Sequence, residues 1–217
     1  MLVALDGTDS FSSEKISCPC CTRQTLKNGK TWCRHTVVSP VIVEPGQSRV
    51  VPLPPEIVVA QDGQEKQDCE LAAAKRWLTG LGQLSRTPTH YPVADDLYCH
   101  HPFCEAVLAQ QMDFLFVCKP DSHIITLLYE WVDDFTRTGE VRALEKSRWN
   151  GKQRLTERYR YINQVPLRDS DDALLVNWCE ITITNAKQEL VYCNAWATSH
   201  AIDEYNVVQT FAVGRAR

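Results

Sequence analysis

The stretch Leu2-Val3-Ala4-Leu5-Asp6-Gly7-Thr8 runs through four apolar residues and then meets an acid and a glycine. A short apolar run that ends at Asp-Gly is typical of an interior β-strand whose last side chain projects from the edge of a sheet. A second stretch, Tyr91 to Tyr98, has the same plan, with Asp95 and Asp96 after a short apolar run. Strand-end acids also serve as caps and turn residues. If the two strands are neighbours, however, their carboxylates can share a cation that prefers oxygen ligands, such as Mg²⁺.

The composition is that of an ordinary globular protein. The chain has 217 residues, of which 44% are hydrophobic and 23% charged, enough for one large domain or a domain with an insertion. The formal net charge of −4 argues against a nucleic-acid clamp that works through bulk charge, although a local basic surface is compatible with it. No apolar run is long enough to span a bilayer, and the N-terminal residues lack the plan of a secretory signal. We therefore expect a cytoplasmic protein without membrane contact, whose ten cysteines are reduced thiols.

A polar insertion at about 12–35 holds a possible metal site. Its potential ligands form a C-x2-C pair and a C-x-H pair, namely Cys18 with Cys21 and Cys33 with His35. The first spacing lets two thiolates turn inward from one tight loop, and residues at i and i+2 share a face of a strand. Cys20 is an alternative ligand, and free cysteines in a polar loop are the alternative reading. Four protein ligands would leave no open coordination position, so a zinc ion here would be structural.

The other patterns along the first part of the chain predict alternating strands and helices. Apolar and β-branched runs predict strands, and apolar positions at helical spacing predict helices. In order, these are strands at 2–6, 36–43 and 49–53, a helix at 65–81, a strand at 92–96, a helix at 102–111, a strand at 114–118 and a helix at 124–138. Three hairpin-linked strands followed by alternating helices and parallel strands describe an α/β fold with a ribonuclease-H-like mixed sheet. The first and fourth strands of that fold are neighbours, which would bring Asp6 beside Asp95.

The character of the chain changes after residue 138. Alternating or apolar runs predict strands at 140–149, 153–161, 174–184 and 189–197, with Asn150-Gly151 as a two-residue hairpin turn. We therefore divide the chain into a core at 1–138, a β-rich insertion at 139–200 and the start of a final helix at 201–217. Trp149 and Trp178 fit core positions of the β-rich insertion. Because both ends of the chain fall within predicted elements, we expect it to be a piece of a longer protein.

Several separated blocks of the sequence resemble the DDE transposases of bacterial insertion sequences, of the IS4 type. The resemblance covers essentially the whole chain. Its blocks are Leu5 to Thr8, Val93 to Tyr98, Val117 to His123, Arg148 to Gly151, Asn177 to Glu180 and Gly214 to Arg217. Such enzymes carry a β-rich insertion before the final catalytic helix.

The resemblance implies metal-dependent cleavage and transfer of DNA strands in DNA transposition, with transposon ends and target DNA as partners. Enzymes of this type use Asp, Asp and Glu to hold two Mg²⁺ or Mn²⁺ ions. Asp6 matches the first acid, and Asp95 matches the second because the family's Asp-x-x-Tyr pattern aligns with Asp95 and Tyr98; Asp96 is the alternative. The third acid follows the Gly-Arg-Ala-Arg block and would lie beyond Arg217. We therefore expect this fragment, truncated at both ends, to be inactive or nearly so.

A non-enzymatic function is the alternative. The chain would then be a zinc-stabilised DNA- or protein-binding remnant that forms a homodimer or interacts with an intact transposase. The missing third acid motivates this hypothesis. Glu180 is expected within a strand, and Glu204 lies too early in the final helix to replace that acid.

A basic run along the 142–160 hairpin is the best candidate surface for DNA. Its members are Arg142, Lys146, Arg148, Lys152, Arg154, Arg158 and Arg160, and strand alternation predicts that many share one face. The alternative is a solvated hairpin face. Lys119 and His123, after the fifth core strand, are placed to contact DNA phosphate or to cap a loop. Lys119, Arg148, Lys152 and Arg154 are the residues for which we predict DNA contact.

Overall fold

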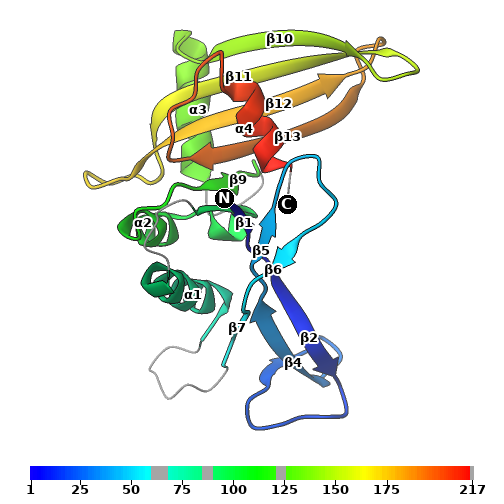
Figure 1. Cartoon of the computed structure of the whole chain (residues 1–217), viewed down its shortest axis with the longest axis vertical. Coiled ribbons are helices and arrows are strands. Elements are labelled where there is room, and N and C mark those ends of the chain that lie inside the picture. The colour runs from blue at the N-terminus through cyan, green and yellow to red at the C-terminus, as the bar shows by residue number, and fades with distance from the viewer. Residues whose placement is uncertain (60–67, 85–89, 121–125, 216–217) are drawn as a thin grey trace.

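The computed structural model describes residues 1–59, 68–84, 90–120 and 126–215. It is an α/β structure built on a 9-stranded mixed sheet, and a smaller 4-stranded sheet projects from one end as an arm (Figure 1). In the described parts of the chain, none of the helices is both long and apolar enough to cross a bilayer.

One half of the large sheet consists of five short strands in the order β6-β5-β1-β8-β9. β1 pairs antiparallel with β5 and parallel with β8, which in turn pairs parallel with β9. β1, β8 and β9 are short and mostly buried, as expected for interior strands of apolar residues. The bounds are Leu2–Ala4 for β1, Val41–Val43 for β5, Val51–Pro52 for β6, Tyr91–Ala94 for β8 and Leu115–Val117 for β9.

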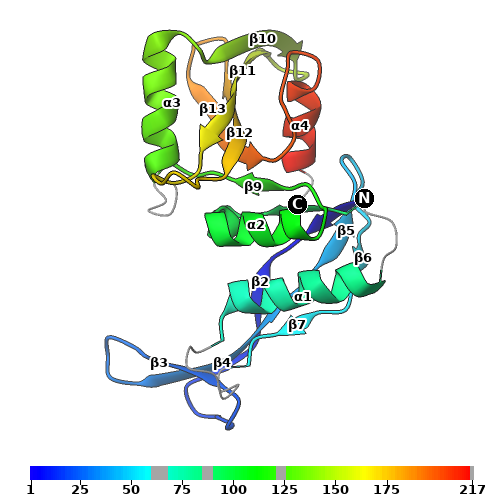
Figure 2. The ribbon, with the colours of Figure 1, turned by 90° about the vertical axis from the view of Figure 1, so that its left-hand side faces the viewer.

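The connections between the parallel strands carry helices. α1 (Glu70–Leu84) precedes β8, and α2 (His101–Ala109) lies between β8 and β9, after the short 3-10 helix η1 (Asp96–Tyr98). α1 and α2 pack against the same face of the sheet (Figure 2). The predicted apolar side of α1 is confirmed, since Ala74, Trp77 and Leu78 are buried in the core.

The β-rich region forms the other half of the same sheet. Strands β10 to β13 follow one another as antiparallel neighbours, and β13 pairs antiparallel with β9. The predicted strands are therefore present, and they extend the core sheet through one continuous ladder. α3 (Thr126–Thr138) and α4 (Val207–Gly214) lie on opposite faces of this half (Figure 2). The strand bounds are Arg142–Trp149 for β10, Arg154–Pro166 for β11, Leu175–Thr184 for β12 and Leu190–Thr198 for β13.

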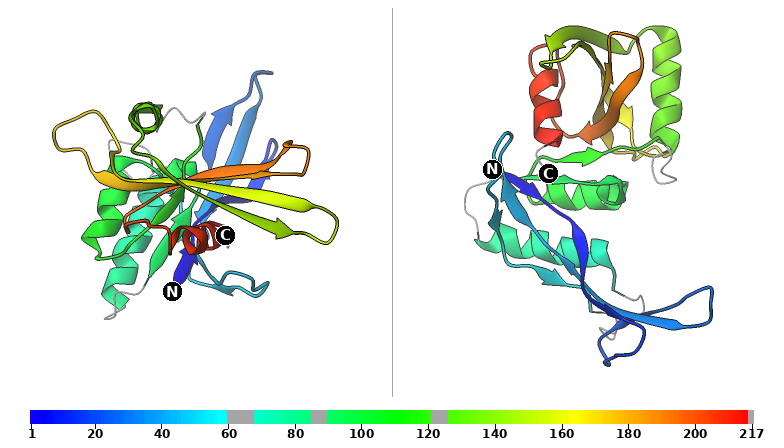
Figure 3. Two further views of the ribbon diagram at one scale, coloured as in Figure 1. Left: turned by 90° about the horizontal axis from the view of Figure 1, so that it is seen from above. Right: turned by 90° about the vertical axis from the view of Figure 1, so that its right-hand side faces the viewer.

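The arm departs from the core directly after Asp6. It consists of β2 (Gly7–Ser13), β3 (Thr22–Thr25), β4 (Thr31–Val38) and β7 (Glu56–Ile57), with β4 in the middle. Figure 3 shows the arm on the side of the core away from β10 to β13. The single strand predicted at 36–43 is wrong: β4 and β5 are separate strands in different sheets, divided at Ser39-Pro40. Proline lacks the backbone N–H that a continuous central strand would need, which explains the break.

Candidate functional site

Asp6 and Asp95 lie at the ends of neighbouring parallel strands. β1 and β8 are in register with Ala4 opposite Val93, and the Leu5 N–H donates to the Val93 carbonyl at 2.9 Å. Asp6 lies two residues after Ala4, and Asp95 lies two residues after Val93. Adjacent strands are about 4.8 Å apart, so the two acids leave the sheet side by side. This is the arrangement that the sequence predicts for them.

Hydrogen bonds distinguish Asp95 from its neighbour Asp96. One oxygen of Asp95 accepts from the Leu97 N–H at 3.1 Å and so caps η1, as strand-end acids often do. The Asp96 carboxylate instead forms an ion pair with Lys119, with Nζ and Oδ1 2.7 Å apart. Asp95, whose carboxylate is held in place, is therefore better suited than Asp96 to share a cation with Asp6. Lys119, for which we predict DNA contact, is already paired with an acid. His123 falls outside the described residues.

A third carboxylate, that of Glu70, lies against the same strand end. Glu70 is the first residue of α1, and its carboxylate packs so closely over Gly7 that a β-carbon there would collide with it. The Tyr98 hydroxyl donates to Glu70 Oε1 at 2.7 Å. Burial raises the pKa of the Glu70 carboxyl, and the charges of Asp95 and Asp6 add to that rise. The third carboxylate therefore shares its electrostatic surroundings with the predicted pair.

Neither of the other two glutamates considered from the sequence joins this group. Glu180 lies within β12 and accepts from Arg160 at 3.2 Å, as expected for a structural residue. Glu204 is exposed and lies in the turn before α4, so the helix begins later than the sequence predicts. Asp203 shapes that turn by accepting from the Tyr205 and Asn206 N–H groups, each at 2.8 Å.

A second cluster of potential metal ligands lies in the arm. The Cys18 and Cys21 thiols lie 3.2 and 3.3 Å from Nε2 of His35 and 3.4 Å from each other. The cysteines belong to the segment between β2 and β3, and His35 lies on β4. A hydrogen bond from the Cys21 thiol lowers the pKa of Cys18, favouring the thiolate that binds metal.

Among the described residues, Cys18, Cys21 and His35 form a group of three potential ligands whose ligand atoms all lie within 4.8 Å of one another. Two thiols and an imidazole are the donors that zinc prefers. Cys33 is buried on β4 and Cys20 is exposed, and both lie outside the group. The carboxylates of Asp6, Asp95 and Glu70 lie farther apart than the ligand atoms of this group, and their oxygen donors suit Mg²⁺ instead.

The basic residues of the β10–β11 hairpin divide between two faces. Arg148 lies opposite Leu155, whereas Arg154 lies opposite Trp149, so the two arginines project to opposite sides of the ladder. Arg142, Lys146 and Arg148 of β10 therefore share one face, as strand alternation predicts, whereas Arg154, Arg158 and Arg160 of β11 share the opposite face. Several members also have acidic partners: Arg148 with Glu157, Arg158 with Glu145 and Arg160 with Glu180.

The tip of this hairpin presents an exposed aromatic ring. Trp149 is 67% exposed, so its predicted core position is wrong, whereas Trp178 is fully buried as predicted. Arg154 lies directly across the ladder from Trp149, and Lys152 follows in the turn. Within the described parts of the chain, Lys152 and Arg154 have no acidic partner within 4.0 Å. An indole flanked by free cations is suited to nucleic acid, because every base offers a face for stacking.

The chain thus combines an oxygen-donor site at the end of β1 and β8, a thiol–imidazole site in the arm and a cationic hairpin tip. The first can hold a hard divalent cation, the second a zinc ion and the third a polyanion. No protein-family model matches the chain, and no curated protein is significantly similar to it.

Proposed function

We propose that this chain is a core of a DDE-type transposase, in which Asp6 and Asp95 hold the divalent cation for cleavage and transfer of DNA strands. The observation that carries the proposal is the position of these two acids at the ends of adjacent parallel strands. Glu70 supports it, because a third carboxylate beside them supplies the additional oxygen donor that a metal-dependent site needs.

The arrangement of the strands favours a ribonuclease-H-like sheet. In the order β6-β5-β1-β8-β9, an antiparallel hairpin group precedes two parallel strands that are linked through helices. The first and fourth strands of that arrangement are β1 and β8, whose ends present the two acids. The strand order therefore supports the resemblance that the sequence blocks suggest.

The residues around the acids have separate tasks in this proposal. Asp6 and Asp95 provide charged oxygens, and a bound Mg²⁺ would stabilise the negative charge that develops on the oxygens of a phosphodiester during displacement. Tyr98 orients the Glu70 carboxylate through its hydroxyl, and Gly7 lets that carboxylate approach the strand end. Because burial raises the pKa of Glu70, a cation at the site would compete with a proton for this carboxylate more strongly than at an ordinary glutamate as pH falls.

DNA would be held by the hairpin tip of Trp149, Lys152 and Arg154. Cations without an acidic partner release counterions from the phosphate backbone when they bind, and the exposed indole can stack on a base. The arm would contribute stability, with zinc bound by Cys18, Cys21 and His35. These roles are consistent with the charge of −4, since the cations are local.

Nicking of supercoiled plasmid tests the proposal. We expect weak cleavage in Mn²⁺ or Mg²⁺ that Asp6→Asn and Asp95→Asn each reduce by at least about tenfold, because each removes a charged ligand. Asp96→Asn is the matched control, since Asp96 is paired with Lys119 and should be dispensable. Absence of nicking by the folded wild-type chain, or nicking that survives both substitutions, would contradict the catalytic proposal.

A non-catalytic, zinc-stabilised binding module is the second candidate function. The convergence of Cys18, Cys21 and His35 favours it, because this cluster is the most compact ligand group in the described residues. Such a module would bind DNA equally well with and without the Asp6 and Asp95 carboxylates, and it would lose binding when zinc is removed. The nicking experiment, repeated as a binding experiment with the same variants, separates the two functions.

A further inference from the structure

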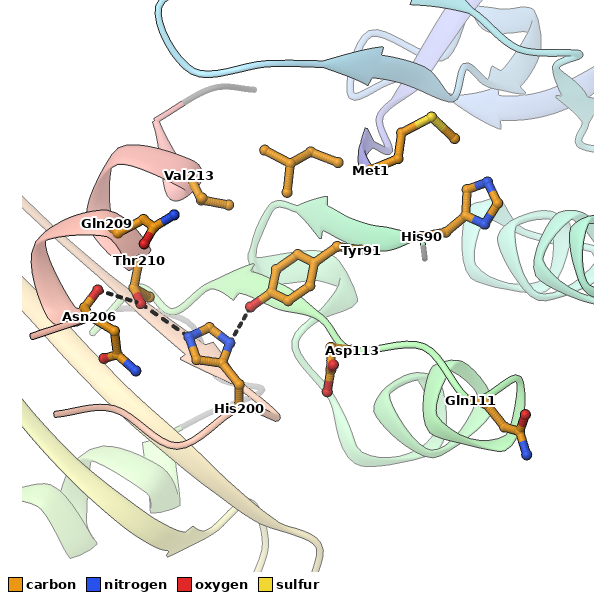
Figure 4. Close-up of a pocket in the computed structure, with 11 residues that line it drawn as sticks. Met1, His90, Tyr91, Gln111, Asp113, His200, Asn206, Gln209, Thr210 and Val213 are labelled. Atoms are coloured by element: carbon orange, nitrogen blue, oxygen red, sulfur yellow. Dashed lines mark hydrogen bonds between the residues drawn. The ribbon is translucent and has the colours of Figure 1, made fainter. Parts of the chain in front are cut away.

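A cavity of about 460 Å³ lies at the other end of the strands that carry the acids. It is bounded by the start of β1 and β8, the segment after α2, and one side of α4 (Figure 4). Its volume falls within the range of about 300–1,000 Å³ that is usual for small-molecule sites. The cavity shares none of its lining residues with the acidic site or the arm, so its function is a separate question.

One wall of the cavity is held in place by a chain of hydrogen bonds. The Tyr91 hydroxyl lies 2.5 Å from Nδ1 of His200, and Nε2 of His200 lies 3.1 Å from the Thr210 hydroxyl (Figure 4). The Tyr91 and His200 rings are 5.7 Å apart between centroids, with an interplanar angle of 48°. This network joins β8, the segment after β13, and α4, so the aromatic wall is preorganised for a ligand.

Several polar groups that line the cavity have hydrogen-bonding capacity left over. The side-chain amides of Gln111 and Gln209 have no hydrogen-bond partner among the described residues. Asp113 accepts from the Ser199 hydroxyl through one oxygen at 2.8 Å, which leaves its second oxygen for a ligand. Nδ1 of His90 is buried and has no hydrogen-bond partner in the described ranges of the chain. These groups offer amide, carboxylate and imidazole contacts around an apolar floor.

The charge of the lining selects the class of ligand. The charges at the lining are the Asp113 carboxylate and the α-amino group of Met1, and no lysine or arginine lines the cavity in the described parts of the chain. These two charges offset each other, so the lining offers no net positive charge to a phosphate group. Burial lowers the pKa of both His90 and His200, which keeps their imidazoles neutral near pH 7. A fitting ligand is therefore uncharged, offers N–H donors, and has a flat apolar face for Leu2, Tyr91 and Val213.

We infer that this cavity binds an amino-bearing nucleobase, either in a free nucleoside or as an unpaired base of single-stranded nucleic acid. Glutamine amides pair with the edge of adenine, and a carboxylate accepts from the exocyclic amine of cytosine. The Tyr91 ring provides a face for stacking, as aromatic side chains do for unpaired bases. The inference goes beyond the proposed strand cleavage and does not depend on it.

Calorimetric titration of the full chain without divalent cations tests the inference. We expect 2′-deoxycytidine and 2′-deoxyadenosine to bind at least about tenfold more tightly than thymidine, because thymidine lacks an exocyclic amine for Asp113. The corresponding 5′-monophosphates should bind more weakly than the nucleosides. The inference would be overturned if thymidine bound as tightly as the other two nucleosides. It would also be overturned if neither the nucleosides nor oligodeoxycytidine bound at all.

Two variants and a second pair of ligands complete the test. Asp113→Asn and Gln209→Ala should each weaken binding, whereas Gln24→Ala, which removes an exposed glutamine in the arm, should leave binding unchanged. Oligodeoxycytidine compared with oligothymidine distinguishes the two sources of the base. Binding of the oligomer alone, with the same dependence on Asp113, identifies the base as part of a single strand. Unfolding curves confirm that each variant is folded, and binding that is indifferent to both variants would contradict the assignment.

Discussion

At the scale of single residues, Glu70 gives the proposed acidic site its strongest support. Its carboxylate is partly buried beside two further acids, an arrangement that favours function over stability. Because its pKa is raised in the folded state, the folded chain holds this proton to higher pH than the unfolded chain does. The contribution of Glu70 to stability therefore falls as pH rises above the ordinary glutamate value of 4.5.

Replacement of Glu70 by glutamine should accordingly raise the midpoint of thermal unfolding at pH 7 without divalent cations. The amide keeps an acceptor for the Tyr98 hydroxyl and removes the charge that burial, Asp95 and Asp6 oppose. The variant should also lose the rise in midpoint that Mg²⁺ gives the wild type through ligation. Glu204→Gln, at an exposed position, is the control and should change neither quantity. A lower midpoint for Glu70→Gln would show that the carboxylate stabilises the fold.

The sequence predicts Asp6 and Asp95 but not Glu70, and the reason is physical. A strand that ends in an acid is a local pattern, and parallel neighbours place such ends together. Glu70 reaches the site because α1 packs across the sheet and because Gly7 has no side chain, which only the tertiary structure reveals. Trp149 is an error of the opposite kind, because the sequence predicts a core position for a side chain that is exposed. Alternation along a hairpin does not show that the hairpin extends past the helices that cover the sheet.

At the scale of elements, the arm is a slender sheet whose stability rests on local links. Its β3 strand has four residues, of which only Thr22 is even partly buried. The outer part of the arm around β3 therefore has little apolar surface to hold it, whereas β4 is anchored by the buried side chains of Cys33 and Val38. The thiol–imidazole cluster lies where it would join the segment before β3 to β4, which is the role that metals have in small sheets.

We therefore expect the purified chain to contain about one zinc ion and to lose it in Cys18→Ser and His35→Ala, since each change removes a ligand. Cys20→Ser is the matched control, because Cys20 neighbours the cluster in sequence but is exposed and outside it. Metal content by atomic emission, and the thermal midpoint with and without a chelator, measure the effect. Retention of zinc by Cys18→Ser, or a Cys20→Ser variant that behaves like Cys18→Ser, would contradict the assignment of ligands.

Two glycines in helices should respond oppositely to alanine. A β-carbon at Gly214 of α4 would lie 2.5 Å from Nε1 and 2.6 Å from Cε2 of Trp196, whose ring is buried. We expect Gly214→Ala to destabilise the fold by about 1–3 kcal/mol through overpacking. A β-carbon at Gly80 of α1 would meet no described atom within 4 Å apart from its own helix backbone, so Gly80→Ala should stabilise by about 0.5–1 kcal/mol. Chemical denaturation of both variants measures these changes, and equal effects would show that contact with Trp196 does not limit position 214.

At the scale of the whole molecule, β9 joins two regions that the sequence presents as distinct. It pairs in parallel with β8 on one side and antiparallel with β13 on the other, so one ladder runs from the acidic site to the hairpin tip. Individual strands are predictable from alternation, but a pairing between residues near 116 and 197 depends on tertiary contacts. β9 therefore lies between β13 and β8, the strand that ends at Asp95.

The same long-range packing makes the fold sensitive to acid. Burial lowers the pKa of His90, His100 and His200 below the ordinary value of 6.5, so the unfolded chain binds protons more readily at these sites. The free energy of unfolding should therefore decrease as pH falls from about 7.5 to about 5.5, and the loss should be reversible. Glu70 has the opposite effect on the free energy of unfolding, because its pKa is raised in the folded chain. That effect begins near the ordinary glutamate pKa of 4.5 and is weaker toward neutral pH. Urea denaturation at several pH values measures the dependence, which His200→Gln should flatten because it removes one of the titrating groups. An unfolding free energy that does not change over this range would show that the three imidazoles titrate alike in the folded and unfolded chains.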